Sequence, residues 1–375
     1  MSVSQPLRAE GAEAAGRERS RTSHPALSTR FCKLVGVEYP IVQTGMGWVS
    51  GARLTAATSA AGGLGILASA TMSLSELESA IKSVKQRTEK PFGVNLRSDQ
   101  PDVIDRIDLM IESGVRVASF AQAPGEKLVR RLKDADVFTM PTIGARRHAE
   151  KVAAWGVDAV IAQGHEGGGH TGEVPTSLLL PEVCAAVDIP VIGAGGFSDG
   201  RGLVAALAYG ASGIAMGTRF LLTQESTVPQ SVKGVYLATP VNGTVVTRSI
   251  DGYPQRVIRT ELIARLEKSG VLTRFPRALY NALSFLRLTE TTFGDLVREG
   301  LSMKKNQNLS YSQVAMAANA PMLTRAAMVE GRTDVGILPT GQVVGVIDEL
   351  PSVAELIERI VREADQTLAR LGARP

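Results

Sequence analysis

The stretch IPVIGAGGFSDGRGLVAALAYGASGIAMGTRF (189–220) contains two short apolar runs, each with a glycine-rich turn near its end. The runs are IPVIGAG (189–195) and GIAMGTRF (213–220), and neither alternates polar with apolar residues. Unbroken apolar runs of this length are typical of parallel strands that are buried on both faces. Because a helical pattern separates the runs, the stretch predicts a β-α-β unit.

Six similar runs precede this stretch, and helical patterns lie between them. One such pattern opens with a capping box of Ser73 and Glu76 and continues with apolar residues at helical spacing. Eight strands that alternate with helices from about residue 39 to 220 predict an α/β fold, a (β/α)8 TIM barrel rather than an open sheet. The six runs are PIVQT (40–44), LGILA (64–68), FGVNL (92–96), VRVASF (115–120), VFTMPT (137–142) and AVIAQG (159–164).

The pattern changes after residue 220. Helical stretches without a repeating strand fill 246–334, so we expect a helical cap subdomain over one mouth of the barrel. A strand-like run, GQVVGVI (341–347), follows, and Ser352 with Glu355 opens a last helix that we expect to return to the barrel wall. The predicted division is a disordered tail at 1–30, a cofactor-binding barrel at 31–245, the cap at 246–334 and a C-terminal segment at 335–375.

Composition limits the classes of protein to which the chain can belong. Of 375 residues, 44% are hydrophobic and 21% are charged, which predicts a globular chain. No apolar run reaches the ~18 residues of a membrane span, and the first 30 residues contain no apolar signal-peptide core. The two cysteines form neither a disulfide framework nor a metal cluster, so we expect a cytoplasmic location and no membrane partner. A net charge of +4 without a basic run argues against nucleic acid and suits an anionic ligand.

The glycine-rich turns after the last two runs predict a phosphate site. In barrels of this kind the active site lies at the C-terminal ends of the strands, and the loops after strands seven and eight usually bind phosphate. Glycine lets backbone N–H groups approach an anion without interference from Cβ. Glycines that only form tight turns are the alternative, but two turns at the two standard positions favour phosphate. The candidate residues are Gly193, Gly195, Gly196, Gly217 and Thr218.

The turn after the first run contains Gly45, Met46 and Gly47. A dinucleotide fingerprint would need a third glycine where Ser50 stands, so we reject a Rossmann fold. Small residues here would instead allow backbone amides to meet the edge of a flat ring. Asn95, after the third run, has an amide that can donate to and accept from such a ring. A structural bond within its loop explains Asn95 equally well.

The loop GHEGGGHTG (164–172) is the strongest local signal. Three consecutive glycines permit an unusual backbone path that would direct His170 into the barrel mouth, where an imidazole can take a proton near neutral pH. A hydrogen-bonding role in the core is the less favoured alternative. Glu166 is the only other candidate ligand between His165 and His170, and no third ligand cluster is visible, so we expect no metal. We interpret His165 as solvent-facing and Glu166 as orienting the loop or binding a cofactor hydroxyl. Histidines without a predicted site role are His24 and His148.

Several of these segments, in this order, resemble the nitronate monooxygenase family. They are VQTGMGW (42–48), FGVNL (92–96), AVIAQGHEGGGHTG (159–172), IPVIGAGGF (189–197) and AMGTRF (215–220), and the resemblance covers about residues 31–365. It implies one FMN held by the glycine-rich turns, His170 at the position of the family's catalytic base, and Gln163 and Asn95 as flavin contacts. The full set of expected cofactor contacts is Gly45, Met46, Gly47, Asn95, Gln163, Gly164, Gly169, Gly193, Gly195, Gly196, Gly217 and Thr218.

One departure refines the resemblance. The family typically has QAPM after the first strand, whereas this chain has QTGM (43–46), with Gly45 in place of proline. The segments VQTGMGWVSGARL (42–54), EGGGHTG (166–172) and MAANAPML (316–323) are closer to a branch found in steroid-degrading actinobacteria. That branch is associated with introducing a double bond into a bicyclic CoA thioester. The resemblance therefore implies an FMN-dependent oxidoreductase that introduces or reduces a C=C bond in a steroid-derived bicyclic CoA thioester.

Three other functions stay open at this point. They are a nitronate monooxygenase that uses oxygen, a catalytically idle barrel that binds a phosphate ligand or a partner subunit, and an enoyl reductase of fatty-acid synthesis. In the favoured reaction we expect hydride exchange between flavin N5 and a carbon near an activated carbonyl, with His170 as base or proton relay. NAD as an external electron partner and assembly into a homo-oligomer also stay open.

Overall fold

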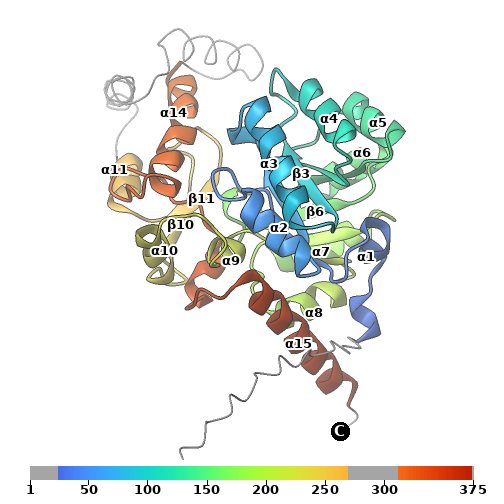
Figure 1. Ribbon diagram of the computed structural model, residues 1–375. Coiled ribbons are helices and arrows are strands. Elements are labelled where there is room, and N and C mark those ends of the chain that lie inside the picture. Colours follow the sequence, from blue (N-terminus) through green and yellow to red (C-terminus); the bar gives the residue numbers. More distant parts are fainter. Residues whose placement is uncertain (1–23, 269–310, 374–375) are drawn as a thin grey trace, which may run out of the picture.

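The computed structural model describes residues 24–268 and 311–373 (Figure 1). Within this part of the chain, eight parallel strands form a closed barrel in which β9 pairs back with β1. Each strand overlaps one of the eight apolar runs, so the TIM-barrel prediction is confirmed. The barrel strands are β1 (Ile41–Gln43), β2 (Leu64–Ala68), β3 (Phe92–Leu96), β4 (Val117–Phe120), β5 (Phe138–Ile143), β6 (Val160–Gln163), β8 (Val191–Ala194) and β9 (Gly213–Met216).

Helices cover the outside of the barrel (Figure 1). Helix α3 begins at the predicted capping box, where Ser73 N–H donates to Glu76 Oε2 at 2.7 Å and Ser73 Oγ accepts from Glu76 N–H. None of the described helices is long and apolar enough to cross a membrane. The helices are η1 (Pro25–Leu27), α1 (Arg30–Val35), α2 (Ala52–Ala60), η2 (Ser69–Thr71), α3 (Leu74–Arg87), α4 (Val103–Glu112), α5 (Glu126–Asp134), α6 (Arg146–Ala154), α7 (Thr176–Cys184), α8 (Gly200–Ala208), α9 (Thr218–Leu221), α10 (Gln230–Leu237), α11 (Glu261–Lys268), α14 (Tyr311–Met328), η3 (Gln342–Val346) and α15 (Val353–Gly372).

The barrel interior is a packed core. Side chains from several strands, among them Val42, Ile66, Met140 and Ile192, are fully buried in one apolar cluster. On the outside, α2 lies directly against β2, because a Cβ on Gly65 would come within 2.1 Å of the Thr55 backbone oxygen. A filled interior leaves room for a ligand at the mouth of the barrel rather than along its axis.

Helix α15 lies against α8 on the barrel wall (Figure 1). It begins at the capping box of Ser352 and Glu355. The two helices approach closely because a Cβ on Gly200 would meet the Ile360 backbone oxygen at 2.3 Å. The C-terminal helix therefore adds buried apolar surface to the main core instead of forming a separate unit.

Residues 24–30 differ from the expected solvated tail. Leu27 is 1% exposed and belongs to the main core. Thr29 donates its hydroxyl to the Ser212 backbone oxygen at 2.7 Å, and the His24 N–H donates to Asp365 on α15 at 2.8 Å. These contacts hold the stretch against the barrel, which a reading based on the polar composition missed. Residues 1–23 of the expected tail lie outside the described residues.

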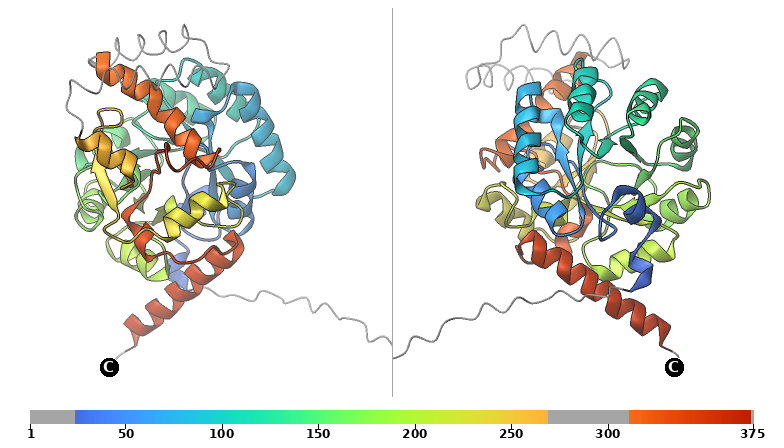
Figure 2. Two further views of the ribbon diagram at one scale, coloured as in Figure 1. Left: turned by 90° about the vertical axis from the view of Figure 1, so that its left-hand side faces the viewer. Right: turned by 45° about the vertical axis from the view of Figure 1, so that its right-hand side comes forward.

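Two strands occur where helices alone were expected. The strands β10 (Thr244–Thr247) and β11 (Gln255–Ile258) form an antiparallel hairpin, and β11 also pairs with β7 (Gly169–His170). The hairpin therefore interrupts the start of a segment that was expected to be mostly helical. The hairpin, α11 and α14 lie together on one side of the barrel (Figure 2, left). Residues 269–310 of the expected cap lie outside the described residues, and the domain division itself stays a prediction.

The run at 341–347 is also not a strand. It forms the 3-10 helix η3. Its backbone packs on the loop after α10, where a Cβ on Gly345 would lie 2.0 Å from Val241 N. The last barrel run likewise ends as a strand at Met216, and α9 begins two residues later.

Candidate active site

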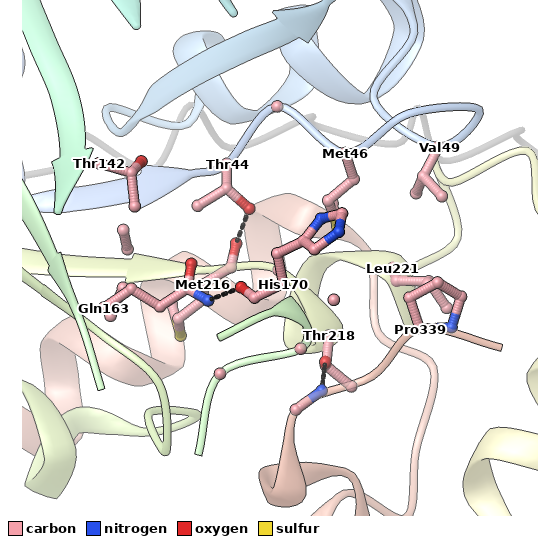
Figure 3. A pocket seen from close by; sticks show the side chains of 18 of the residues that line it. Thr44, Met46, Val49, Thr142, Gln163, His170, Met216, Thr218, Leu221 and Pro339 are labelled. Carbon is pink, nitrogen blue, oxygen red and sulfur yellow. Dashed lines mark hydrogen bonds between the residues drawn. The ribbon is translucent and has the colours of Figure 1, made fainter. Parts of the chain in front are cut away.

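A cavity of about 480 Å³ lies at the C-terminal ends of the barrel strands (Figure 3). The turns that follow β1, β3, β6, β8 and β9 converge on it. This arrangement brings together most of the residues that the sequence singled out. The predicted residues that line the cavity are Gly45, Met46, Gly47, Asn95, Gln163, Gly169, His170, Gly195, Gly196, Gly217 and Thr218.

Gly164 and Gly193 are not brought into this cavity. A Cβ on Gly164 would lie 2.1 Å from Thr176 Oγ1, and a Cβ on Gly193 would lie 2.8 Å from Leu180 Cδ2. Both glycines therefore face α7 and allow it to pack closely against the barrel. Their predicted role as cofactor contacts has no support in the geometry.

The turn after β8 has the backbone shape of an anion cradle. Gly195 and Gly196 have φ angles of +97° and +82°, in the left-handed region that favours glycine. Among the described residues, neither N–H group has an acceptor. On the neighbouring strand β9, Gly217 precedes α9, whose first N–H groups also point outward from the helix start. Successive free N–H groups of this kind suit a phosphate.

The C-terminal segment completes this cradle. The Gly341 N–H donates to Thr218 Oγ1 at 2.9 Å (Figure 3), and the Gln342 N–H donates to the Glu166 backbone oxygen at 2.9 Å. Pro339 and Gly341 line the cavity itself. Sequence reasoning missed this contribution, since no local pattern reports a contact between residues more than 100 positions apart.

Glu166 orients the loop that carries His170. Its Oε2 accepts from Thr176 N–H at 2.9 Å and from Thr176 Oγ1 at 2.8 Å. A carboxylate at the first turn of α7 is stabilised by the unpaired N–H groups of the helix. Of the two expected roles of Glu166, the structure thus favours orienting the loop over binding a cofactor hydroxyl. His165 is half-buried rather than solvent-facing, with Nδ1 at 2.8 Å from the Gly172 backbone oxygen.

Asn95 both lines the cavity and makes a structural bond. Its Nδ2 donates to Ser119 Oγ at 3.3 Å, so the two readings of Asn95 are compatible. Gly45 packs against it, because a Cβ on Gly45 would lie 2.3 Å from Asn95 Cβ. A larger residue at position 45 would displace Asn95, which gives a physical reason for the glycine in QTGM.

His170 lies at the mouth of the cavity with its side chain 63% exposed. Its Nε2 is 2.8 Å from Asp251 Oδ2, and the Asp251 side chain is only 9% exposed. Asp251 comes from the turn between β10 and β11, so it reaches His170 across 81 residues of sequence. The sequence analysis missed Asp251, although Asp251-Gly252 between two β-branched runs is a hairpin signal.

A second cavity of about 710 Å³ adjoins the first, and the two share lining residues that include Gln163 and His170. Its other walls carry polar groups, among them Arg97, His148 and Tyr253. His148 lies on α6 as expected of an outer helix, but it faces this cavity and was given no role from the sequence. His170 therefore stands where two ligands could meet.

The closed barrel has glycine turns after β8 and β9 and a histidine at its mouth, and by its family the chain is a flavin-dependent oxidoreductase. A family model described as nitronate monooxygenase matches residues 28–363. The chain belongs to the nitronate monooxygenase family.

Its relatives include two proteins named (3aS,4S,5R,7aS)-5-hydroxy-7a-methyl-1-oxo-octahydro-1H-indene-4-carboxyl-CoA dehydrogenase. The protein of Mycobacterium tuberculosis is 58% identical over 341 residues, which is 90% of this chain and 96% of that protein. The protein of Rhodococcus jostii is 58% identical over 347 residues, with 92% and 98% covered. A probable nitronate monooxygenase of Staphylococcus saprophyticus is 33% identical over 289 residues, with 64% and 81% covered.

Solved structures show the same architecture. FabK from Thermotoga maritima matches with a TM-score of 0.75 and 35% identity, covering 92% of this chain and 98% of that one. A nitroalkane oxidase from Streptomyces ansochromogenes matches with a TM-score of 0.72 and 28% identity, covering 91% and 99%. The family resemblance read from the sequence is therefore confirmed.

Proposed function

We propose that this chain is an FMN-dependent oxidoreductase that introduces or reduces a C=C bond in a steroid-derived bicyclic CoA thioester. The observation that carries the proposal is the 58% identity, over nearly the whole chain, to two dehydrogenases named for a bicyclic carboxyl-CoA. Oxidation of alkyl nitronates is the second candidate, and it rests on the family and on more distant relatives.

The cavity fits FMN. The N–H groups of Gly195, Gly196 and Gly217 would hold its phosphate, and the turn at 45–47 with Asn95 would contact the edge of its ring. One phosphate cradle suits a mononucleotide better than FAD. When bound, FMN exchanges hydride with the substrate, and the protein supplies orientation and proton transfer.

His170 would act on the thioester side of the reaction. A thioester makes the neighbouring C–H acidic, so a base within reach can remove that proton. His170 has an exposed imidazole at the boundary of both cavities, and no other histidine among the described residues lines the first cavity. The second cavity would give the remainder of the CoA thioester room beside it.

The decisive experiment compares two substrates under anaerobic conditions. Mass spectrometry of the chromophore released by heat first distinguishes FMN from FAD. The yellow protein is then mixed with the saturated bicyclic CoA thioester, and separately with propionate 3-nitronate.

Flavin bleaching by the CoA ester supports the proposal. Reoxidation of the reduced flavin by the unsaturated ester tests whether the enzyme also reduces the double bond. Bleaching by the nitronate alone would make nitronate oxidation the function, and absence of any flavin would favour an idle barrel. Adding NAD to the reduced enzyme tests it as electron partner.

A further inference from the structure

The carboxylate of Asp251 is fixed in one orientation beside His170. Its Oδ1 accepts from the Tyr253 N–H at 3.0 Å. Its Oδ2 is in contact with His170 Nε2 at 2.8 Å and also accepts from the Gln255 side-chain amide. Both oxygens are therefore engaged, and the side chain is nearly shielded from water. Such a carboxylate can impose an orientation on the ring that it contacts.

The contact determines which nitrogen of His170 holds the hydrogen. A carboxylate only accepts hydrogen bonds, so at 2.8 Å the His170 Nε2 must donate. The Gln255 amide nitrogen also lies 3.1 Å from Nε2, and because that nitrogen only donates, a bond between the two would need Nε2 to accept. The shorter contact with the charged carboxylate outweighs it, and the Gln255 amide donates to the carboxylate as well. A neutral imidazole has a single N–H. Nδ1 is then a free acceptor, and it has no hydrogen-bond partner among the described residues.

We propose that Asp251 is a positioning residue that holds His170 in the Nε2–H tautomer and so makes Nδ1 the proton-accepting atom of the site. The proton passes from a substrate carbon to Nδ1, the electron pair of that C–H bond stays on the carbon, and Asp251 remains ionised. The Asp251 charge then stabilises the imidazolium that forms, as a buried aspartate does beside the histidine of a serine-protease triad. This role rests on the proposed function only in taking His170 as the base.

The competing explanation is that Asp251 merely shapes the turn between β10 and β11 through the Tyr253 N–H. Two substitutions separate the two explanations. Asp251→Asn keeps the size of the side chain and its contact with the Tyr253 N–H, but its NH2 group faces His170 Nε2 and forces the hydrogen onto Nδ1. Asp251→Ala removes the side-chain contact with the turn but leaves both tautomers of His170 accessible. If Asp251 positions His170, Asp251→Asn should slow flavin reduction more than Asp251→Ala does. If Asp251 only shapes the turn, Asp251→Ala should slow it more.

The expected rate effect is large. We expect Asp251→Asn to lower the rate constant of flavin reduction by about 10²- to 10⁴-fold, with flavin content and substrate KM close to wild type. Asp251→Ala should lower this rate constant by a smaller factor. Asp136→Asn is the matched control, because the Asp136 side chain is fully exposed in the turn before β5. We expect that control to behave as wild type.

A measurement on the resting flavoprotein tests the tautomer without any substrate. The ¹⁵N chemical shifts of labelled histidines distinguish Nε2–H from Nδ1–H, and the His170 signal is the one missing in His170→Ala. We expect Nε2–H in the wild type and Nδ1–H in Asp251→Asn. Wild-type Nδ1–H, or an Asn variant faster than the Ala variant, would overturn the proposal. The rates can be measured with whichever substrate reduces the flavin, so failure of the CoA ester does not affect this test.

Discussion

Gln163 and His170 are joined by a hydrogen bond of 2.7 Å from the Gln163 amide nitrogen to the His170 backbone oxygen (Figure 3). The bond links the end of barrel strand β6 to strand β7 of the three-stranded sheet. It therefore ties the position of the proposed base to the barrel that would hold the cofactor. Gln163 was expected to contact the flavin, and its amide nitrogen already has this partner within the protein.

Replacing Gln163 should consequently slow catalysis through His170. We expect Gln163→Ala to lower the rate constant of flavin reduction by up to about 100-fold, because small misplacements of a reacting group are costly. Stopped-flow absorbance measures this rate. Gln224→Ala is the control, since Gln224 donates to the Leu350 backbone oxygen on the exposed surface. Equal rates in the two variants would show that the Gln163 bond does not position His170.

The cradle predicts a selective loss of cofactor. In Gly195→Ala a side chain must adopt φ near +97°, at a cost of about 1–2 kcal/mol, and its Cβ would lie 3.0 Å from the Gly167 N. We expect a clearly reduced ratio of flavin to protein absorbance after purification. Gly114→Ala, with φ +64° and open space around the Cβ, has similar strain far from the cavity. It should lower Tm and keep its flavin; retention of flavin in both variants would contradict the assignment.

His170→Ala tests the proton-transfer role directly. Because the exposed imidazole contributes little to the core, the variant should fold and stay yellow. Removal of a general base typically costs about 10²–10⁴ in rate, and we expect a loss of that size in substrate-dependent flavin reduction. Anaerobic stopped-flow absorbance provides the measurement. A variant that reduces its flavin at the wild-type rate would exclude His170 from the mechanism.

Acid stability should depend on Asp102. The hydrogen bond from the buried Arg106 guanidinium lowers the pKa of the Asp102 carboxyl below its usual value. A lowered carboxyl pKa stabilises the fold at pH values above the usual pKa, and that stability is lost as pH falls through the lowered pKa. We expect Asp102→Asn to reduce the free energy of unfolding by about 1 kcal/mol at neutral pH, after allowance for partial exposure.

The difference between wild type and Asp102→Asn should begin to shrink as the pH falls below about 4, where the Asp102 carboxyl of the unfolded chain takes up a proton. It should vanish once the pH has fallen through the lowered pKa of the folded protein, where the Asp102 side chain is as uncharged as that of Asn. Urea denaturation at several pH values measures it. Asp99→Asn is the control, because Asp99 pairs with Arg97 at the surface, where an ion pair contributes little. A difference between wild type and Asp102→Asn that is constant with pH would show that the Asp102 charge is not responsible.

The barrel was predictable because each of its strands can be recognised from its own short stretch of sequence. A run such as LGILA (64–68) is apolar throughout, which only a strand covered on both faces needs, and the structure buries all five of its residues. The glycine turns were predictable for a related reason, since the architecture fixes where a phosphate can bind. Pattern and position together were sufficient to place these turns at the mouth of the barrel.

The hairpin and η3 were missed because a segment forms a strand only where a neighbouring strand pairs with it, and the local sequence does not show that neighbour. Strand β11 contains Gln255 and Arg256, which look unsuited to burial, yet Arg256 is buried with its guanidinium bonded to the His165 backbone oxygen. The run at 341–347 shows the opposite error, because its strand-like residues form the 3-10 helix η3. Asp251 was missed for the same reason, since its function depends on a contact made only in the folded chain.

The barrel carries the glycine turns, whereas His170 and Asp251 belong to the three-stranded sheet β10-β11-β7 and its turn. Mutations in that sheet can therefore change the proton-transfer groups while the walls that would hold the cofactor stay intact. Over evolutionary time, a lineage can exchange or extend the hairpin without rebuilding the barrel. This separation lets the same barrel support several reactions. Laboratory evolution of activity on new substrates can therefore begin at the hairpin at 244–258.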